Sequence, residues 1–162
     1  TSIACAKLLE SGQVDFAITN YPNSGLSNTQ NVRIIREFKD VFVANDEYKE
    51  LKGKTVSLKD LKQFPILMLD RKSTTSEFLH SMFQRHQLDL VPEIELSSND
   101  LLIDLARIGL GVAFVPDYCI PENEHNLFRV QTEEDLPARQ LVVASNESLP
   151  ISQAAKQFME ML

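Results

Sequence analysis

A polar hexapeptide at residues 71–76 carries the residue types best suited to binding a small anion. It follows an apolar run at residues 65–70 and precedes a helical pattern, so a strand is expected to end and a helix to begin there. Backbone N–H groups and the helix dipole at such a start attract anions, and two cations and several hydroxyls stand beside them. The proposed ligand-binding residues are Arg71, Lys72, Ser73, Thr74 and Thr75. The alternative interpretation is helix capping with solvated charges, in which Thr74 and Glu77 form a capping box.

A second helix start has the same character. Ser97, Ser98 and Asn99 follow an expected strand at residues 93–96 and precede an apolar stripe at residues 101–108. In a parallel sheet both helix starts would lie at the carboxyl ends of the strands, where ligands bind. Capping and ligand binding remain the two interpretations here as well.

Catalysis has little support in the residue pattern. His80, His86 and His125 have no partner at metal-ligand spacing, and we expect surface or helix-end positions for them. Cys119 could be a nucleophile or a redox sensor, but a small buried hydrophobic residue is the preferred interpretation. Gly109-x-Gly111 precedes a strand, so it is not a phosphate-binding loop. We therefore expect no enzyme activity, no metal ion and no cofactor.

The composition excludes several classes of protein. The 162 residues are 43% hydrophobic, which is enough for a folded core. A net charge of −7 argues against direct binding of nucleic-acid phosphates by this chain. The apolar runs are too short to span a bilayer, and two distant cysteines favour a reducing compartment.

Strand and helix patterns alternate along the chain. Besides the elements around the two helix starts, strands are expected at residues 14–19, 32–35, 40–44, 112–115 and 140–144. Helices are expected at residues 3–11, after a capping box at residues 57–60, and at the end, where an apolar stripe spans residues 151–162. Residues 21–31 are expected to form a loop. The alternation predicts an α/β fold with a mainly parallel sheet.

Four segments, in this order, resemble the effector-binding domain of LysR-type transcriptional regulators. They are Leu9 to Ile18, Val56 to Ile66, Gly109 to Pro116, and Arg139 to Val143 followed by the C-terminal helix. Each segment alone is weakly specific, but their order and spacing cover nearly the whole chain.

The resemblance implies two Rossmann-like lobes of periplasmic-binding-protein type II architecture. Lobe one would be residues 1–38 plus 142–162, and lobe two residues 39–141. Family members have a first β-α-β unit before the position of Thr1, so lobe one is expected to lack it. We expect the chain to be a fragment, in which lobe one either stays incomplete or is completed by a noncovalently retained N-terminal piece or by a neighbouring subunit.

The resemblance also implies a function. A small anionic metabolite would bind between the lobes and control DNA binding by an N-terminal helix-turn-helix that this chain lacks. Thr1, Ser2, Asn20 and Tyr21 would face the ligand from lobe one. The implied setting is cytoplasmic, with a homodimer or homotetramer, RNA polymerase as a contact of the full-length protein and no membrane. The alternatives are a periplasmic solute-binding module of a transporter and an enzyme using Cys119 on the same scaffold.

Overall fold

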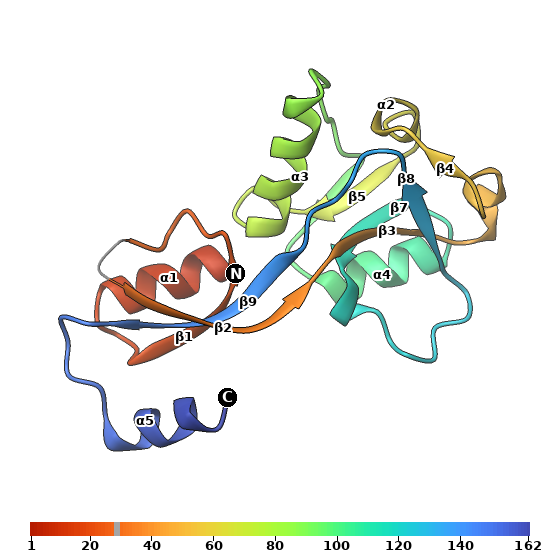
Figure 1. The fold of residues 1–162 in the computed structure, drawn as a ribbon. Helices are drawn as coiled ribbons and strands as arrows, with labels where there is room; N and C mark the ends of the chain where they lie inside the picture. Colours follow the sequence, from red (N-terminus) through yellow and green to blue (C-terminus); the bar gives the residue numbers. More distant parts are fainter. Residues whose placement is uncertain (28–29) are drawn as a thin grey trace. The chain divides into compact units, whose positions relative to one another are not determined.

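The computed structural model describes residues 1–27 and 30–162, and the chain forms two compact units. Unit 1 comprises residues 1–38 and 139–162, and unit 2 comprises residues 39–138 (Figure 1). Unit 2 is therefore inserted into unit 1 along the sequence. Of the loop predicted at residues 21–31, positions 28 and 29 lie outside the described residues, while Tyr21 ends one strand and Gln30 begins the next.

Unit 1 is a three-stranded antiparallel sheet with two helices. Its elements are α1 (Ser2–Glu10), β1 (Phe16–Tyr21), β2 (Gln30–Phe38), β9 (Arg139–Asn146) and α5 (Gln153–Glu160). The strand order is β1-β9-β2. Leu9 of α1 packs with Ala17 and Ala144 in a small core. The apolar spacing of α1 thus buries one face of the helix against the sheet.

The C-terminal helix buries only part of its apolar stripe. Ser152 caps α5, and its amide donates to the Asp15 carboxylate at 3.3 Å. The Phe158 ring stacks on Phe16 with 5.4 Å between ring centroids. Ala155 is buried, yet Phe158 remains 45% exposed.

Unit 2 is built on a six-stranded mixed sheet in the order β4-β8-β3-β7-β5-β6. Its strands are β3 (Asp40–Ala44), β4 (Thr55–Val56), β5 (Ile66–Leu69), β6 (Ile94–Leu96), β7 (Val112–Pro116) and β8 (Phe128–Thr132). Its α-helices are α2 (Leu58–Leu61), α3 (Thr74–Arg85) and α4 (Asn99–Arg107), and its 3-10 helices are η1 (Asp46–Leu51) and η2 (Asp117–Cys119).

The expectation of a mainly parallel sheet agrees with three of the five strand pairings in unit 2 and is wrong for unit 1, whose two pairings are antiparallel. β5 pairs in parallel with β6 and β7, and β4 with β8, but β3 is antiparallel to both β7 and β8. Parallel neighbours need a crossover, which α3 and α4 supply between β5, β6 and β7. β3 and β9 pair with strands that lie far from them in the sequence, so strand direction there depends on partners that the local sequence does not reveal.

The unit 2 sheet is buried on both faces. Phe42, Met68 and Phe114 pack in the cluster that includes Leu79 and Phe83 of α3. Their sequence neighbours point to the other face, where the cluster with α4 includes Val43, Leu67, Val115 and Leu102. A strand that is buried on both faces has a continuous run of apolar residues in its sequence, as residues 65–70 do. Among the described helices, none is long and apolar enough to cross a membrane.

Candidate functional site

The start of α3 is capped one residue earlier than predicted. Ser73 is the N-cap, and its Oγ accepts the Ser76 amide at 3.0 Å. Thr74 is the first helical residue, so the predicted Thr74–Glu77 capping box is wrong. Ser73, Thr74 and Thr75 are buried, whereas Arg71 and Lys72 are exposed. Serine and threonine both cap helices well, so local preference could not decide which of the two neighbours would cap this helix.

The start of α4 agrees with the sequence prediction. Ser98 is the N-cap, and its Oγ accepts the Leu101 amide at 3.3 Å. Ser97 is exposed, while Ser98 and Asn99 are half-buried. The Asn99 Oδ1 is buried and has no hydrogen-bond partner within the described part of the chain.

The two helix starts lie at the same edge of the sheet. β5 and β6 run parallel and end together, with Leu69 in register with Leu96. The Asp70 amide donates to the Leu96 carbonyl at 2.8 Å and so ties the two loops together. The structure therefore brings the 71–75 and 97–99 groups of candidate residues into one neighbourhood.

The electrostatics of the two helix starts differ. Both first turns carry one acidic residue, Glu77 in α3 and Asp100 in α4, but α3 is also directly preceded by the cations Arg71 and Lys72. The pKa of Cys119 is raised to about 11, first by burial and then by Asp100 and other carboxylates, although a hydrogen bond donated by the Asn99 side-chain amide lowers it. The α3 start thus suits an anionic group, and the α4 start suits a hydroxyl or another hydrogen-bond donor.

The candidates in unit 1 also come together. Thr1 caps α1 by accepting the Ala4 amide at 3.3 Å, and the Ser2 Oγ accepts the Asn20 amide at 3.2 Å. Asn20 is buried, while Tyr21 is 40% exposed. Thr1, Ser2 and Asn20 therefore form one polar cluster at the start of α1, with Tyr21 next to it in sequence.

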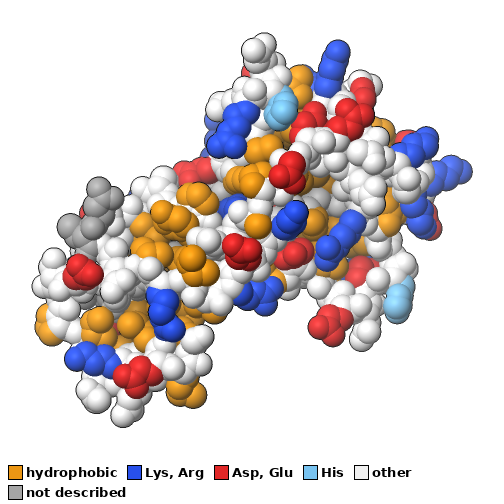
Figure 2. Space-filling model, viewed as in Figure 1, with side chains coloured by type: hydrophobic (Ala, Val, Ile, Leu, Met, Phe, Trp, Pro, Cys, Tyr) orange, Lys and Arg blue, Asp and Glu red, His pale blue; other side chains and the backbone are white. Residues whose placement is uncertain are grey.

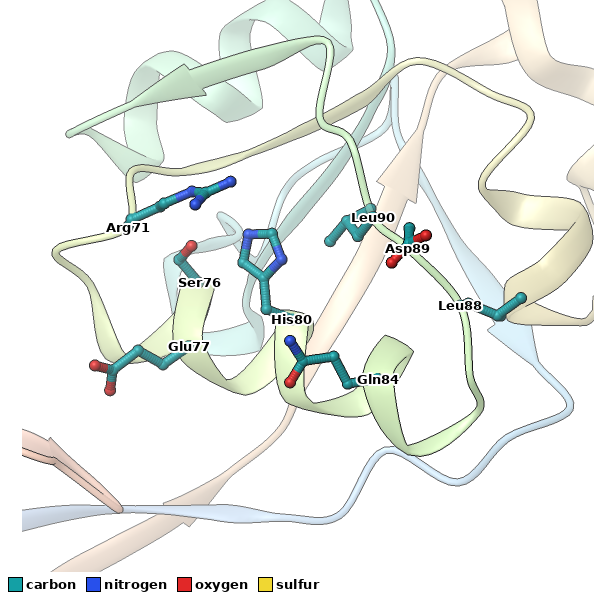
Figure 3. Close-up of a pocket in the computed structure, with 8 residues that line it drawn as sticks. All are labelled: Arg71, Ser76, Glu77, His80, Gln84, Leu88, Asp89 and Leu90. Carbon is teal, nitrogen blue, oxygen red and sulfur yellow. The ribbon is translucent and has the colours of Figure 1, made fainter.

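His80 departs from the surface position expected for it. It is half-buried and lines a pocket of about 400 Å³ that also contains Arg71 and Ser76 (Figure 3). Burial lowers the pKa of His80, and the Arg71 charge lowers it further. The spacing of Ser76, His80 and Gln84, four residues apart on one helix, was the signal in the sequence that could have indicated a shared face.

The described residues contain no group of three or more histidine, cysteine or acidic side chains placed to hold a metal ion. On the face shown in Figure 2, basic side chains lie among acidic ones across unit 2. The hydroxyl and backbone N–H groups at the described helix starts are of the kind that hydrogen-bond a small polar solute.

Two α/β units, one inserted into the other, with polar helix starts at the ends of parallel strands, define a solute-binding class of domain. The chain belongs to the LysR substrate binding domain family, whose match spans residues 1–162. The resemblance found in the sequence and the predicted fold class are therefore confirmed, and a transporter module is not favoured.

Known regulators share part of this sequence. The chain is 29% identical over 122 residues to the HTH-type transcriptional regulator BsdA of Bacillus subtilis (strain 168), covering 74% of this chain and 41% of BsdA. It is 28% identical over 90 residues to the HTH-type transcriptional activator CmpR of Synechocystis sp. (strain ATCC 27184 / PCC 6803 / Kazusa), covering 56% of this chain and 30% of CmpR. The chain thus spans less than half the length of either relative.

Solved structures share the fold. The Synechocystis PCC6803 CcmR regulatory domain, in complex with 2-PG, has a TM-score of 0.87 at 16% identity, covering 99% of this chain and 77% of that one. The effector-binding domain of QuiR, in complex with shikimate, has a TM-score of 0.85 at 17% identity, covering 99% and 75%.

Proposed function

We propose that this chain senses a small anionic metabolite and acts as the regulatory part of a LysR-type transcriptional regulator. The observation that carries the proposal is the pair of helix starts that the Asp70–Leu96 hydrogen bond holds together at one sheet edge. The anionic group of the metabolite binds at the α3 start, where Arg71 and Lys72 supply positive charge and Ser73 to Thr75 supply hydroxyls. Ser97, Ser98 and Asn99 bind its hydroxyl or amine groups.

The ligands of the structural neighbours support this chemistry. Both 2-PG and shikimate, held by the CcmR and QuiR domains, are small acids. We propose the same class of ligand here, and we assign Thr1, Ser2, Asn20 and Tyr21 as contacts contributed by unit 1. The two units correspond to the two lobes of the effector domain.

The full-length protein acts by allostery in this proposal. Effector binding shifts the assembly of a homodimer or homotetramer, and DNA is bound through a helix-turn-helix outside this chain, with RNA polymerase as a further contact. The protein works in the cytoplasm and makes or breaks no bond in its effector. A ligand shifts such an equilibrium only by its differential affinity for the two states, typically about 1–3 kcal/mol.

Calorimetry with 2-PG, shikimate and other small carboxylates tests the proposal. We expect at least one of them to bind and raise the melting temperature. Thr74→Val removes one hydroxyl at nearly constant volume and should weaken binding about tenfold or more, as expected for losing a hydrogen bond to a charged group. Because Ser73 is the cap, the free energy of unfolding should change by less than about 1 kcal/mol.

Thr55→Val in β4 is the matched control, since Thr55 is exposed and lies outside both helix starts. It should leave both affinity and stability unchanged. If no carboxylate or phosphate in the panel bound at millimolar concentration, the proposal of an anionic effector would be refuted. Equal losses of affinity in Thr74→Val and Thr55→Val would refute the assigned site.

A further inference from the structure

The pocket beside α3 contains polar groups that capping and core packing do not explain. The Ser76 side chain is fully buried, and its Oγ finds no hydrogen-bond partner among the described residues. The same holds for the Nε2 of His80, one helical turn further along. Buried polar groups are normally hydrogen-bonded. Two buried atoms without partners in the lining of one pocket therefore indicate that a bound molecule supplies their hydrogen bonds.

The walls of this pocket differ in charge from one end to the other. In Figure 3 the Arg71 guanidinium extends above the Ser76 hydroxyl, with the His80 ring beside them. Asp89 lies on the far side of the His80 ring from Arg71, and Leu88 and Leu90 supply apolar surface from the same loop. One end therefore offers a cation and hydrogen-bond donors, and the other offers a carboxylate.

This arrangement disfavours a simple anion. Glu77 and Asp89 both line the pocket, and Arg71 is also 3.9 Å from the Glu95 carboxylate on β6. These carboxylates repel a purely anionic ligand, whereas a molecule with its own ammonium group gains an attraction at the Asp89 end.

We propose that this pocket binds a small zwitterion with an apolar side chain, that is, a neutral aliphatic amino acid. Its carboxylate accepts hydrogen bonds from Arg71, Ser76 and the Nε2–H of His80. Its ammonium group donates to Asp89, and its side chain packs against Leu88 and Leu90. The site lies on the flank of α3. It shares Arg71 with the effector position proposed at the helix start, but it uses Ser76, His80 and Asp89 in place of Ser73 to Thr75.

Three matched probes test this inference on the whole 162-residue chain. They are L-leucine, 4-methylpentanoate, which lacks the ammonium group, and 3-methylbutylamine, which lacks the carboxylate. We expect L-leucine to bind at least about tenfold more tightly than either fragment, because each fragment loses one charged hydrogen-bonded end. In nitrogen-15 spectra L-leucine should move the His80 ring resonances and raise the pKa of His80, since a carboxylate favours the protonated ring.

Substitutions separate binding from structure. Ser76→Ala and Arg71→Gln should each weaken L-leucine binding about tenfold, while Asp89→Asn should weaken L-leucine and leave 4-methylpentanoate unchanged. Arg85→Gln removes a positive charge from the same helix outside the pocket and should have no effect. Thr74→Val, which alters the α3 start, should also leave the affinity for L-leucine unchanged. A failure of the amino-acid proposal can therefore be distinguished from a failure of the effector proposal.

Several outcomes would overturn the inference. Equal affinity for L-leucine and 4-methylpentanoate would show that the ammonium group is not recognised. An unmoved His80 resonance at saturating L-leucine would place the ligand elsewhere. If L-leucine did not bind at tens of millimolar and Ser76→Ala were as stable as the wild type, we would conclude that the pocket holds only water and that the inference is wrong.

Discussion

Replacing Gly111 with alanine should destabilise unit 2 strongly. A Cβ built at this position would lie 2.5 Å from the Pro65 carbonyl oxygen and 2.8 Å from the Leu67 Cγ. A relaxed carbon–oxygen contact needs about 3.3 Å, so β7 and β5 would have to separate by about 0.8 Å. The Pro65 carbonyl cannot move alone, because it accepts the Val112 amide at 2.8 Å.

The expected cost combines two effects. Overpacking a tight core costs about 1–3 kcal/mol, and weakening the Val112–Pro65 hydrogen bond adds about 1 kcal/mol. We therefore expect Gly111→Ala to lower the free energy of unfolding by about 3 kcal/mol, which for a chain of this length lowers the melting temperature by about 10 °C.

Urea unfolding followed by far-ultraviolet circular dichroism measures this change, and Gly53→Ala is the matched control. Gly53 has φ +72 and nothing within 4 Å of its built Cβ, so alanine there should cost only the backbone penalty of about 1–2 kcal/mol. If Gly111→Ala were no more destabilising than Gly53→Ala, the close approach of β7 to β5 would not be what selects glycine.

Three further predictions concern single side chains. The hydrogen bond from Arg107 lowers the pKa of Glu124 in the folded protein. The pair therefore stabilises the fold fully above the pKa that Glu124 has in the unfolded chain, about 4.3. This stabilisation is lost as the pH falls through the lower pKa that Glu124 has in the folded protein. Glu124→Gln should therefore be less stable than the wild type at pH 7, and the difference should shrink toward pH 3 in urea titrations; a constant difference would contradict the pairing. Cys119, with its pKa at about 11, should react with iodoacetamide more slowly than glutathione at pH 8, measured in a Cys5→Ser background, and rapid alkylation at pH 7 would contradict its burial. Ser98→Ala should cost about 1 kcal/mol of unfolding free energy through loss of the α4 cap, and an unchanged urea midpoint would show that the Ser98–Leu101 hydrogen bond contributes nothing.

Much of the local structure could be predicted from the sequence. Ser57 and Ser98 cap helices as expected, and the apolar run at residues 65–70 contains a doubly buried strand. The family was predicted from four short segments. These features depend on residues within a few positions of one another, so the sequence itself contains the necessary information.

Other features escaped prediction for a common physical reason. The short strand β8 was missed, and the antiparallel direction of β3 was not expected. Strand direction and pairing are set by partners up to about 130 residues away, as for Phe16 and Ser145, and the sequence between them does not encode the choice locally.

The candidate sites show the same division between local and tertiary information. Local patterns were enough to predict that helices begin at residues 71–76 and 97–99, and that these residues have groups able to bind a polar ligand. The tertiary structure was needed to show that Ser73 is the cap, that the Asp70–Leu96 hydrogen bond joins the two starts, and that Arg71, Ser76 and His80 line one pocket. Helix starts follow from hydrogen bonds between near neighbours, whereas this pocket exists only once α3 has packed with the loop that follows β5 and the loop that follows α3.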